Sequence, residues 1–185
     1  MLPSLIGVIA SSGGASASTT SYESISTVTL GSASSSISFT SIPSTYQHLQ
    51  LRINWGFTDT ANNTWLNATF NGDTGSSYSY HAIRANGSTV TTSAGTSASK
   101  AVFGADDNGD ASIWGVSVVD ILDYKDTNKY KTTRALAGQD RNGAGVVNFW
   151  SSSWRDTAAI NSITIVPDSS TFRTGSKFAL YGIKG

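Results

Sequence analysis

Hydrophobic and polar residues alternate most clearly in HLQLRINWGF, residues 48–57. Every second position of this stretch is apolar, at Leu49, Leu51, Ile53, Trp55 and Phe57. Successive side chains of a β-strand point to opposite faces of the sheet, so this alternation predicts a strand with one buried face and one wet face. Trp55 belongs to the buried set and is expected in the core.

Shorter runs rich in β-branched and aromatic residues predict the other strands. These runs are residues 22–30, 36–42, 64–70, 77–83, 130–138, 146–150, 162–167 and 177–183. Residues 88–99 are typical of a loop or a weak edge strand, and residues 151–159 of one helical turn. Turn signals at a spacing of roughly 10 to 15 residues favour an all-β chain folded as an antiparallel β-sandwich. We expect a jelly roll with an extended N-terminal arm.

The longest apolar run is SIWGVSVVDILDYKD, residues 112–126. It is shorter than the roughly 20 residues that a membrane-spanning helix needs. Its valines and isoleucines favour a strand over a helix. They stand at both odd- and even-numbered positions, so both faces of such a strand would be apolar. We therefore expect a central strand that is buried on both faces, bent at Gly115, and paired with residues 130–138.

Three Asn-Gly pairs predict tight turns, because both residues accept the positive φ angles that such turns require. They lie at residues 71–72, 86–87 and 142–143. The first pair is expected to close a hairpin between the strands at residues 64–70 and 77–83.

The chain divides near residue 20 into an arm, residues 1–20, and a sandwich domain, residues 21–185. Small residues fill positions 11–21, in the manner of a flexible linker. The arm begins with an apolar patch made of Leu2, Leu5, Ile6, Val8 and Ile9. A secretory signal is disfavoured, because no basic residue precedes this short patch and Gly7 interrupts it. We expect the patch to dock on a partner or on neighbouring copies, with folding back onto its own domain as the alternative.

Charge and cysteine content exclude several classes of function. The chain has twelve basic and twelve acidic residues and a formal net charge of zero, which disfavours electrostatic binding to nucleic acid or to a membrane surface. It has no cysteine, so it has no disulfide, zinc–thiolate site or thiol nucleophile.

Acidic residues gather in ADDNGD, residues 105–110. Asp106, Asn108 and Asp110 have the spacing that opens a calcium-binding EF-hand loop. However, glycine stands at the fourth loop position instead of the sixth, and Ser117 takes the place of the bidentate glutamate. A structural turn explains the residues with fewer assumptions than a calcium site, and a catalytic role is the least favoured reading. We predict no metal and no cofactor.

Nothing in the sequence predicts an enzyme, and no catalytic residue is assigned. Asp120 and Asp123 point to opposite faces of an extended strand, so they cannot form a carboxylate pair across a substrate. Surface ion pairs are the more natural role for both, with partners drawn from Lys125, Lys129, Lys131 and Arg134. The two histidines, His48 and His81, are too few for a histidine metal site.

The aromatic residues leave one ligand-binding alternative. Trp65, Trp150 and Trp154 are the candidates for a sugar-stacking platform, together with Tyr78, Tyr80, Tyr124 and Tyr130. The favoured interpretation is that most of these rings fill the core or a subunit interface.

Four segments of the chain carry a resemblance to a known family. They are residues 21–52, 70–83, 118–138 and 162–185, the last of which ends in ALYGIKG. Through them, residues 21–185 resemble a family of small virion-associated proteins from tailed phages of aquatic bacteria, including cyanobacteria. The resemblance implies a structural role in the virion and carries no catalytic residues.

The expected function is therefore that of a capsid decoration (cement) protein on the virion surface. It would dock through its arm onto the major capsid protein or other virion proteins and stabilise the shell. Jelly-roll modules on virions are often trimers, so we expect this protein to form a homotrimer. The alternative is a tail-fibre or other receptor-binding module that contacts host surface glycan.

Overall fold

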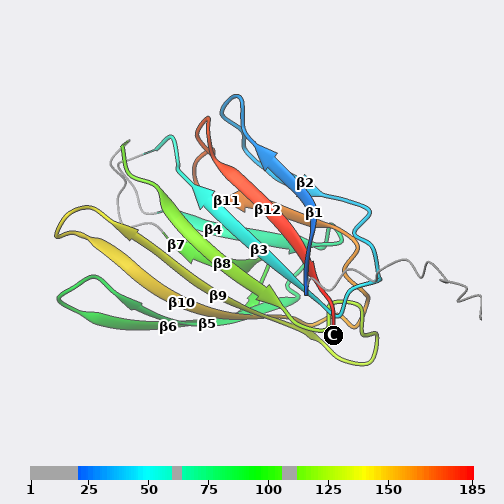
Figure 1. The fold of residues 1–185 in the computed structure, drawn as a ribbon. Coiled ribbons are helices and arrows are strands. Elements are labelled where there is room, and N and C mark those ends of the chain that lie inside the picture. Colours follow the sequence, from blue (N-terminus) through cyan, green and yellow to red (C-terminus); the bar gives the residue numbers. More distant parts are fainter. Residues whose placement is uncertain (1–20, 60–63, 106–111) are drawn as a thin grey trace, which may run out of the picture.

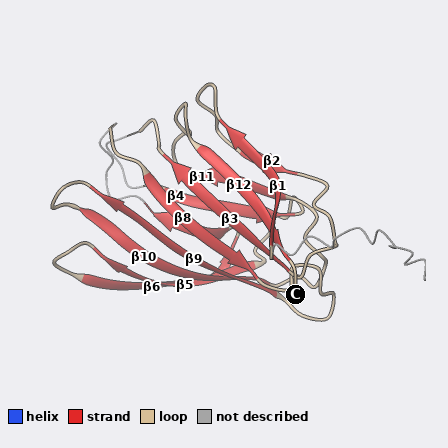
Figure 2. Ribbon diagram, in the orientation of Figure 1, coloured by secondary structure: helices blue, strands red, loops and turns tan. Residues whose placement is uncertain are grey.

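The computed structural model describes residues 21–59, 64–105 and 112–185, and this part of the chain forms twelve strands and no helix (Figures 1 and 2). The strands are β1 Tyr22–Thr29, β2 Ile37–Phe39, β3 His48–Trp55, β4 Trp65–Phe70, β5 Tyr78–Ala85, β6 Val90–Ala98, β7 Ala101–Ala105, β8 Gly115–Ile121, β9 Lys131–Asp140, β10 Gly145–Trp154, β11 Ile163–Pro167 and β12 Lys177–Ile183.

The strands form two antiparallel sheets that pack as a sandwich, as the sequence predicts. The large sheet has the order β1-β12-β3-β8-β9-β10-β5-β6 and lies in front in Figure 1. The small sheet, β2-β11-β4-β7, lies behind it. The strand arrangement is compatible with a jelly roll, which stays a prediction.

The strand predictions are wrong at two places, and one open alternative is decided. Residues 90–98 form an edge strand, β6, which is one of the two expectations for residues 88–99. β7 was not predicted at all. Every residue of β7 is buried, so its sequence AVFGA shows no alternation that could reveal a strand. The predicted helical turn at residues 151–159 is absent, because β10 continues to Trp154.

The Asn-Gly turns are confirmed, but one joins strands of different sheets. Asn142 and Gly143 have φ angles of 54° and 103° and close the β9–β10 hairpin. Asn71 and Gly72, with φ angles of 52° and 73°, connect β4 in the small sheet to β5 in the large sheet. The turn chemistry was therefore predicted correctly at residues 71–72, whereas the hairpin was not.

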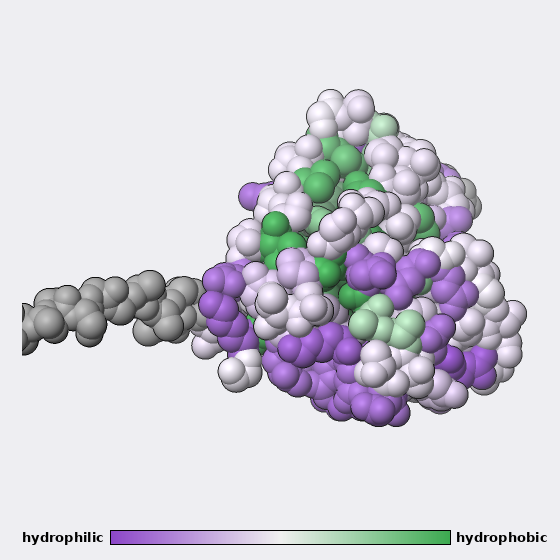
Figure 3. Space-filling view, turned by 90° about the vertical axis from the view of Figure 1, so that its right-hand side faces the viewer, coloured by the Kyte–Doolittle hydropathy of each residue, from purple (hydrophilic) through white to green (hydrophobic). Residues whose placement is uncertain are grey.

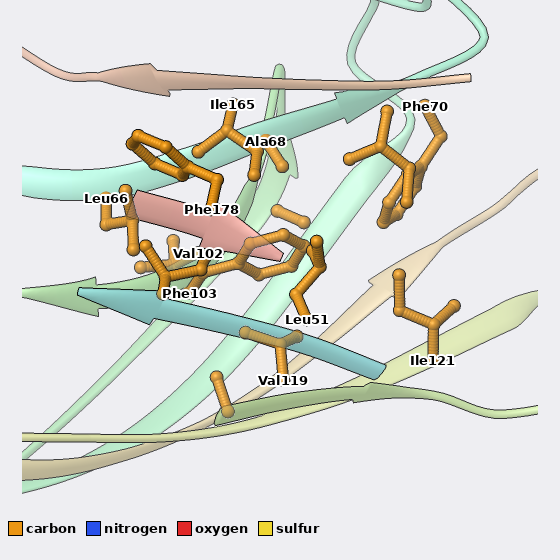
Figure 4. Close-up of a cluster of buried hydrophobic side chains, with 14 of the residues drawn as sticks. Leu51, Leu66, Ala68, Phe70, Val102, Phe103, Val119, Ile121, Ile165 and Phe178 are labelled. Carbon is orange, nitrogen blue, oxygen red and sulfur yellow. The ribbon is translucent and has the colours of Figure 1, made fainter. Parts of the chain in front are cut away.

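The core lies between the two sheets and is made of large apolar side chains (Figure 4). The large sheet contributes Leu51, Val119, Ile121 and Phe178, and the small sheet contributes Leu66, Ala68, Phe70, Val102, Phe103 and Ile165. Each fully buried Val, Leu, Ile or Phe side chain stabilises the fold by about 1.5–3 kcal/mol. Figure 3 shows one side of the molecule, on which small groups of hydrophobic residues lie among neutral and hydrophilic ones.

Trp55 is fully buried at the end of β3, as predicted. Its Nε1 donates a hydrogen bond to Ser117 Oγ at 3.0 Å. A Cβ at Gly115 would lie 2.3 Å from the indole ring, so the ring requires a glycine there. β8 begins at Gly115, so the predicted bend would fall at the start of the strand and not within it.

Lys131 is buried, which corrects its predicted place in a surface ion pair. Its Nζ donates hydrogen bonds to the carbonyl oxygens of Asp126, Lys129 and Thr157 at 2.5, 2.9 and 3.0 Å. Burial lowers the pKa of this amine, and the three carbonyls supply the polar partners that a buried ammonium needs.

Tyr78 is a second buried polar group. Its hydroxyl accepts a hydrogen bond from the Phe70 backbone N–H at 2.9 Å and donates one to the Asp73 carbonyl at 3.0 Å. Burial raises the pKa of Tyr78 from 10.0 to about 12, because ionisation would place a charge in the core.

This raised pKa predicts a loss of stability at alkaline pH. Between pH 10 and about 12 the unfolded chain releases the Tyr78 proton while the folded chain keeps it, so the free energy of unfolding falls as pH rises. The loss is on the order of 2 kcal/mol and is measured by urea unfolding across this range. Tyr78→Phe should flatten the profile relative to Tyr130→Phe, which removes an exposed phenol. Identical profiles for the two variants would contradict the assignment.

Candidate functional site: the open face of the large sheet

One face of the large sheet packs on the small sheet, and the other, here called the open face, does not. Burial alternates strictly along β8, where Ser117 and Val119 are buried while Val116 and Val118 are exposed. The prediction that this strand is buried on both faces is therefore wrong, although its central position in the sheet is correct.

Strand register aligns the apolar side chains of the open face in two neighbouring rows. Residues paired across antiparallel strands lie on the same face of the sheet. The first row runs through Arg52, Val118, Leu136, Phe149, Ile83 and Thr92. The second row runs through Asn54, Val116, Gly138, Val147, Ala85 and Val90.

Seven large side chains of these rows are exposed to solvent, and they are called the apolar rows below. Val116, Leu136 and Val147 are 55%, 58% and 59% exposed, values typical of surface residues. The full set is Ile83, Val90, Val116, Val118, Leu136, Val147 and Phe149. Together they expose several hundred Å² of apolar surface, on the order of the largest patches of monomeric proteins, which often mark interaction sites.

A polar row borders the apolar rows on one side. It contains Gln50, Asp120, Arg134, Ser151 and His81 at paired positions of β3, β8, β9, β10 and β5. Gln50 Nε2 donates to Asp120 Oδ1 at 2.8 Å, and Arg52 Nε donates to Gln50 Oε1 at 2.9 Å. An apolar centre with a polar rim is the usual anatomy of a protein interface.

A groove lies at the end of the open face where the hairpin turns meet β8. It encloses about 510 Å³, and its walls include Trp114, Asn86 and Asp140. Val116, Gly138 and Val147 of the second apolar row also line it. Trp114 is 36% exposed, and the Arg173 guanidinium carbon lies 4.5 Å from its ring centre. The groove therefore offers an exposed indole beside amide and carboxylate groups.

The predicted sugar platform is not formed. Trp150 and Trp154 are fully buried, so neither ring has a face free for a sugar. Their Nε1 atoms donate to Asn148 Oδ1 and Asp73 Oδ2, each at 2.7 Å, and the second bond holds the pKa of Asp73 below its usual value. Trp65 is partly buried and packs on Trp150 with ring centres 5.2 Å apart. The favoured core interpretation of these rings is correct.

The carboxylates of the open-face region form structural pairs. Asp123 accepts hydrogen bonds from Lys129 Nζ at 2.5 Å and Gln47 Nε2 at 2.6 Å, which lower its pKa. His48 Nδ1 accepts a hydrogen bond from the Asp123 backbone N–H at 2.9 Å. The predicted pairing of Asp123 with Lys129 is confirmed, whereas Asp120 binds Gln50.

Two sets of predicted residues lie outside the described part of the chain. They are the arm patch, Leu2, Leu5, Ile6, Val8 and Ile9, and the acidic turn Asp106–Asp110, so both assignments stay predictions. Within the described ranges, no group of three His, Cys, Asp or Glu side chains is placed to hold a metal ion.

Sequence reasoning missed Trp114 and the apolar rows. Trp114, Val116, Val118 and Asp120 share one parity, and the charge of Asp120 marks that parity as the solvent side. Arg134 marks the parity of Leu136 in the same way. A signal for the open face was therefore present, but Val119 and Ile121 on the other face of the strand obscured it.

Comparisons with protein-family models, curated proteins and solved structures found no match to this chain. Over the residues that the structure describes, no helix has the length and apolar character required to cross a membrane.

Because Leu136 is exposed on the open face, we predict that it can be replaced at little cost to stability. Leu136→Ser should lower the free energy of unfolding by less than about 1 kcal/mol, because the side chain already meets water. Leu51→Ala, in the core, should cost about 2–5 kcal/mol. Urea unfolding of dilute protein measures both, and an equal cost for the two variants would show that Leu136 is covered in solution.

Proposed function

We propose that the protein is a structural component of a tailed-phage virion, most specifically a capsid decoration protein, and that its open face binds a neighbouring virion protein. The single observation that carries the binding role is the pair of apolar rows on a face of the large sheet. The resemblance of residues 21–185 to virion-associated phage proteins supports the assignment to a virion.

The chemistry of the open face suits an apolar protein surface better than a charged partner. Leu136, Phe149 and Ile83 sit side by side in the first apolar row, with Val116 and Val147 beside them. Covering such side chains releases about 25 cal/mol per Å² of apolar surface. The net charge of zero adds no long-range attraction or repulsion, so binding rests on shape and apolar contact.

A decoration protein stabilises a shell by binding the assembled lattice and not its free subunits. The arm, residues 1–20, supplies a second contact in this proposal. The chain enters the large sheet at its β1 edge, where the Ser21 carbonyl accepts a hydrogen bond from the Lys184 backbone N–H at 3.0 Å. The arm and the apolar rows therefore contact the virion from different parts of the sheet.

The test is binding of the full chain to phage particles that lack it, quantified against the major shell protein by mass spectrometry. We expect a copy number comparable to that of the shell protein. Leu136→Ser combined with Phe149→Ser should lower occupancy at least tenfold, because the apolar contact is lost. Deletion of residues 1–20 should abolish incorporation without unfolding the sandwich.

The matched control is Leu122→Ser, which replaces an exposed leucine outside the apolar rows and should leave occupancy unchanged. A few copies per particle would move the protein to the tail. Complete absence from particles at saturating protein would contradict the virion role.

The groove beside Trp114 favours one second candidate, a receptor-binding module of the tail that contacts host glycan. An exposed indole face stacks on the apolar face of a sugar ring, and nearby Asn86 and Asp140 are suited to bind hydroxyl groups. This site replaces the platform of buried tryptophans as the place where a sugar would bind.

This candidate predicts a dependence of glycan binding on Trp114. On a glycan array, Trp114→Ala should remove binding, while Tyr130→Ala, which removes an exposed ring away from the groove, should keep it. Binding that is equal in both variants, or absent from the unmodified chain, would exclude the groove as a glycan site.

A further inference from the structure

The two sheets end in four edge strands, β1 and β6 in the large sheet and β2 and β7 in the small sheet. An edge strand presents unpaired N–H and C=O groups that can pair with another chain. Proteins usually block such edges by short length, charge, bulges or cover. Comparing the four edges therefore shows where this chain is open to strand pairing.

Three of the edges carry such blocks. β2 has only three residues, and all five residues of β7 are buried. β1 carries Glu23, which forms an ion pair with Lys184 at 2.9 Å, and its pairing with β12 is broken by a bulge between Ser24 and Ser26.

The fourth edge, β6, has none of these blocks over most of its length. Its nine residues, VTTSAGTSA, include no charge and no proline, and no side chain of β6 is fully buried. Its pairing with β5 is regular from Val90 to Gly95 and shifts only beyond that, near Ser97, whose φ angle is 53°. In the described part of the chain, β6 pairs with β5 alone. Figure 1 shows it at the free lower edge of the large sheet.

We propose that the β6 edge binds the β6 edge of a second copy, antiparallel and about a twofold axis. Two identical strands paired in this way have equal length and matching hydrogen-bonding groups. Their Ser, Thr, Ala and Gly side chains are small, so the symmetry mates do not clash. Neither strand carries a charge, and the chain as a whole is neutral, so no repulsion opposes the approach of two copies.

The open face strengthens the case for a second copy. Val90 is 64% exposed and belongs to β6, and Ile83 on the neighbouring β5 is 49% exposed. Both lie at the end of the apolar rows that adjoins this edge. Pairing two β6 strands would join the two large sheets into one continuous sheet and bring both sets of apolar rows onto a single face.

The inference does not rest on the virion role, because the edge belongs to the isolated chain. It predicts an even number of copies, whereas the resemblance to virion modules implies a homotrimer. The mass of the particle in solution therefore decides between the two.

The test measures the mass of the full chain by sedimentation over a range of concentrations, with a charge placed on each edge of the large sheet. Thr92→Lys puts an ammonium on β6. Its control is Thr27→Lys on β1, because Thr27 and Thr92 are exposed threonines at opposite ends of the same cross-strand row. We expect the unmodified chain and Thr27→Lys to form dimers, and Thr92→Lys to raise the dissociation constant at least tenfold.

A monomer at every concentration, a trimer mass, or equal dimerisation of Thr92→Lys would overturn the proposal. Urea unfolding of both variants shows that each is folded. Loss of dimers in Leu136→Ser but not in Thr92→Lys would also overturn it, since the open face would then be the contact.

Cross-linking gives a second and independent readout, because the chain has no cysteine. Cysteine is placed singly at each β6 position from Val90 to Ala94, because only the residue on the twofold axis faces its own copy, and at Thr27 as a control. A disulfide needs Cβ atoms about 4 Å apart, which only strands paired at that position provide. We expect a covalent dimer from at least one β6 position and none from Thr27. Failure at all five β6 positions would contradict twofold pairing in the regular part of the strand, whatever the outcome of the particle-binding experiment.

Discussion

The contact between the Trp55 indole and the start of β8 is the interaction on which the rest of the large sheet depends. The ring covers Gly115, and its Nε1 donates to Ser117 Oγ. A shift of β8 by one residue would place the side chain of Val116 where only a hydrogen fits, and would turn Ser117 away from the indole. Because side chains alternate along a strand, such a shift would also exchange the buried and exposed faces of β8.

The position of β8 then sets the positions of the strands beyond it. Paired residues share a face, so Val118 on the open face requires Leu136, Phe149 and Ile83 to be there as well. The same pairing sends Val119 and Ala135 into the core. The packed core and the exposed apolar rows therefore both follow from the same strand register. A register shift that removed the apolar rows from the surface would also disrupt the core.

This register also explains which parts of the structure could be predicted from the sequence. β3 was predictable because charged and amide side chains stand between Leu49, Leu51, Ile53 and Trp55, so the solvent-facing side of the strand can be recognised. In β8 apolar residues stand at both odd- and even-numbered positions, and only Asp120 marks the open face. The same ambiguity applies to Trp150, since the polar residues Asn148 and Ser152 share its buried face of β10.

The strand order also decides which residues lie at the two ends of the large sheet. At the β1 end, Arg52 lies against the Tyr181 and Tyr22 rings, and Glu23 binds Lys184, so this end is charged and closed. At the β6 end, the apolar rows reach an edge that no charge blocks. The chain enters the sheet at the β1 end. A contact made by the arm and a contact made by β6 would therefore lie at opposite edges of one sheet. Under the proposed decoration role, contacts at both edges would let one molecule link two neighbours.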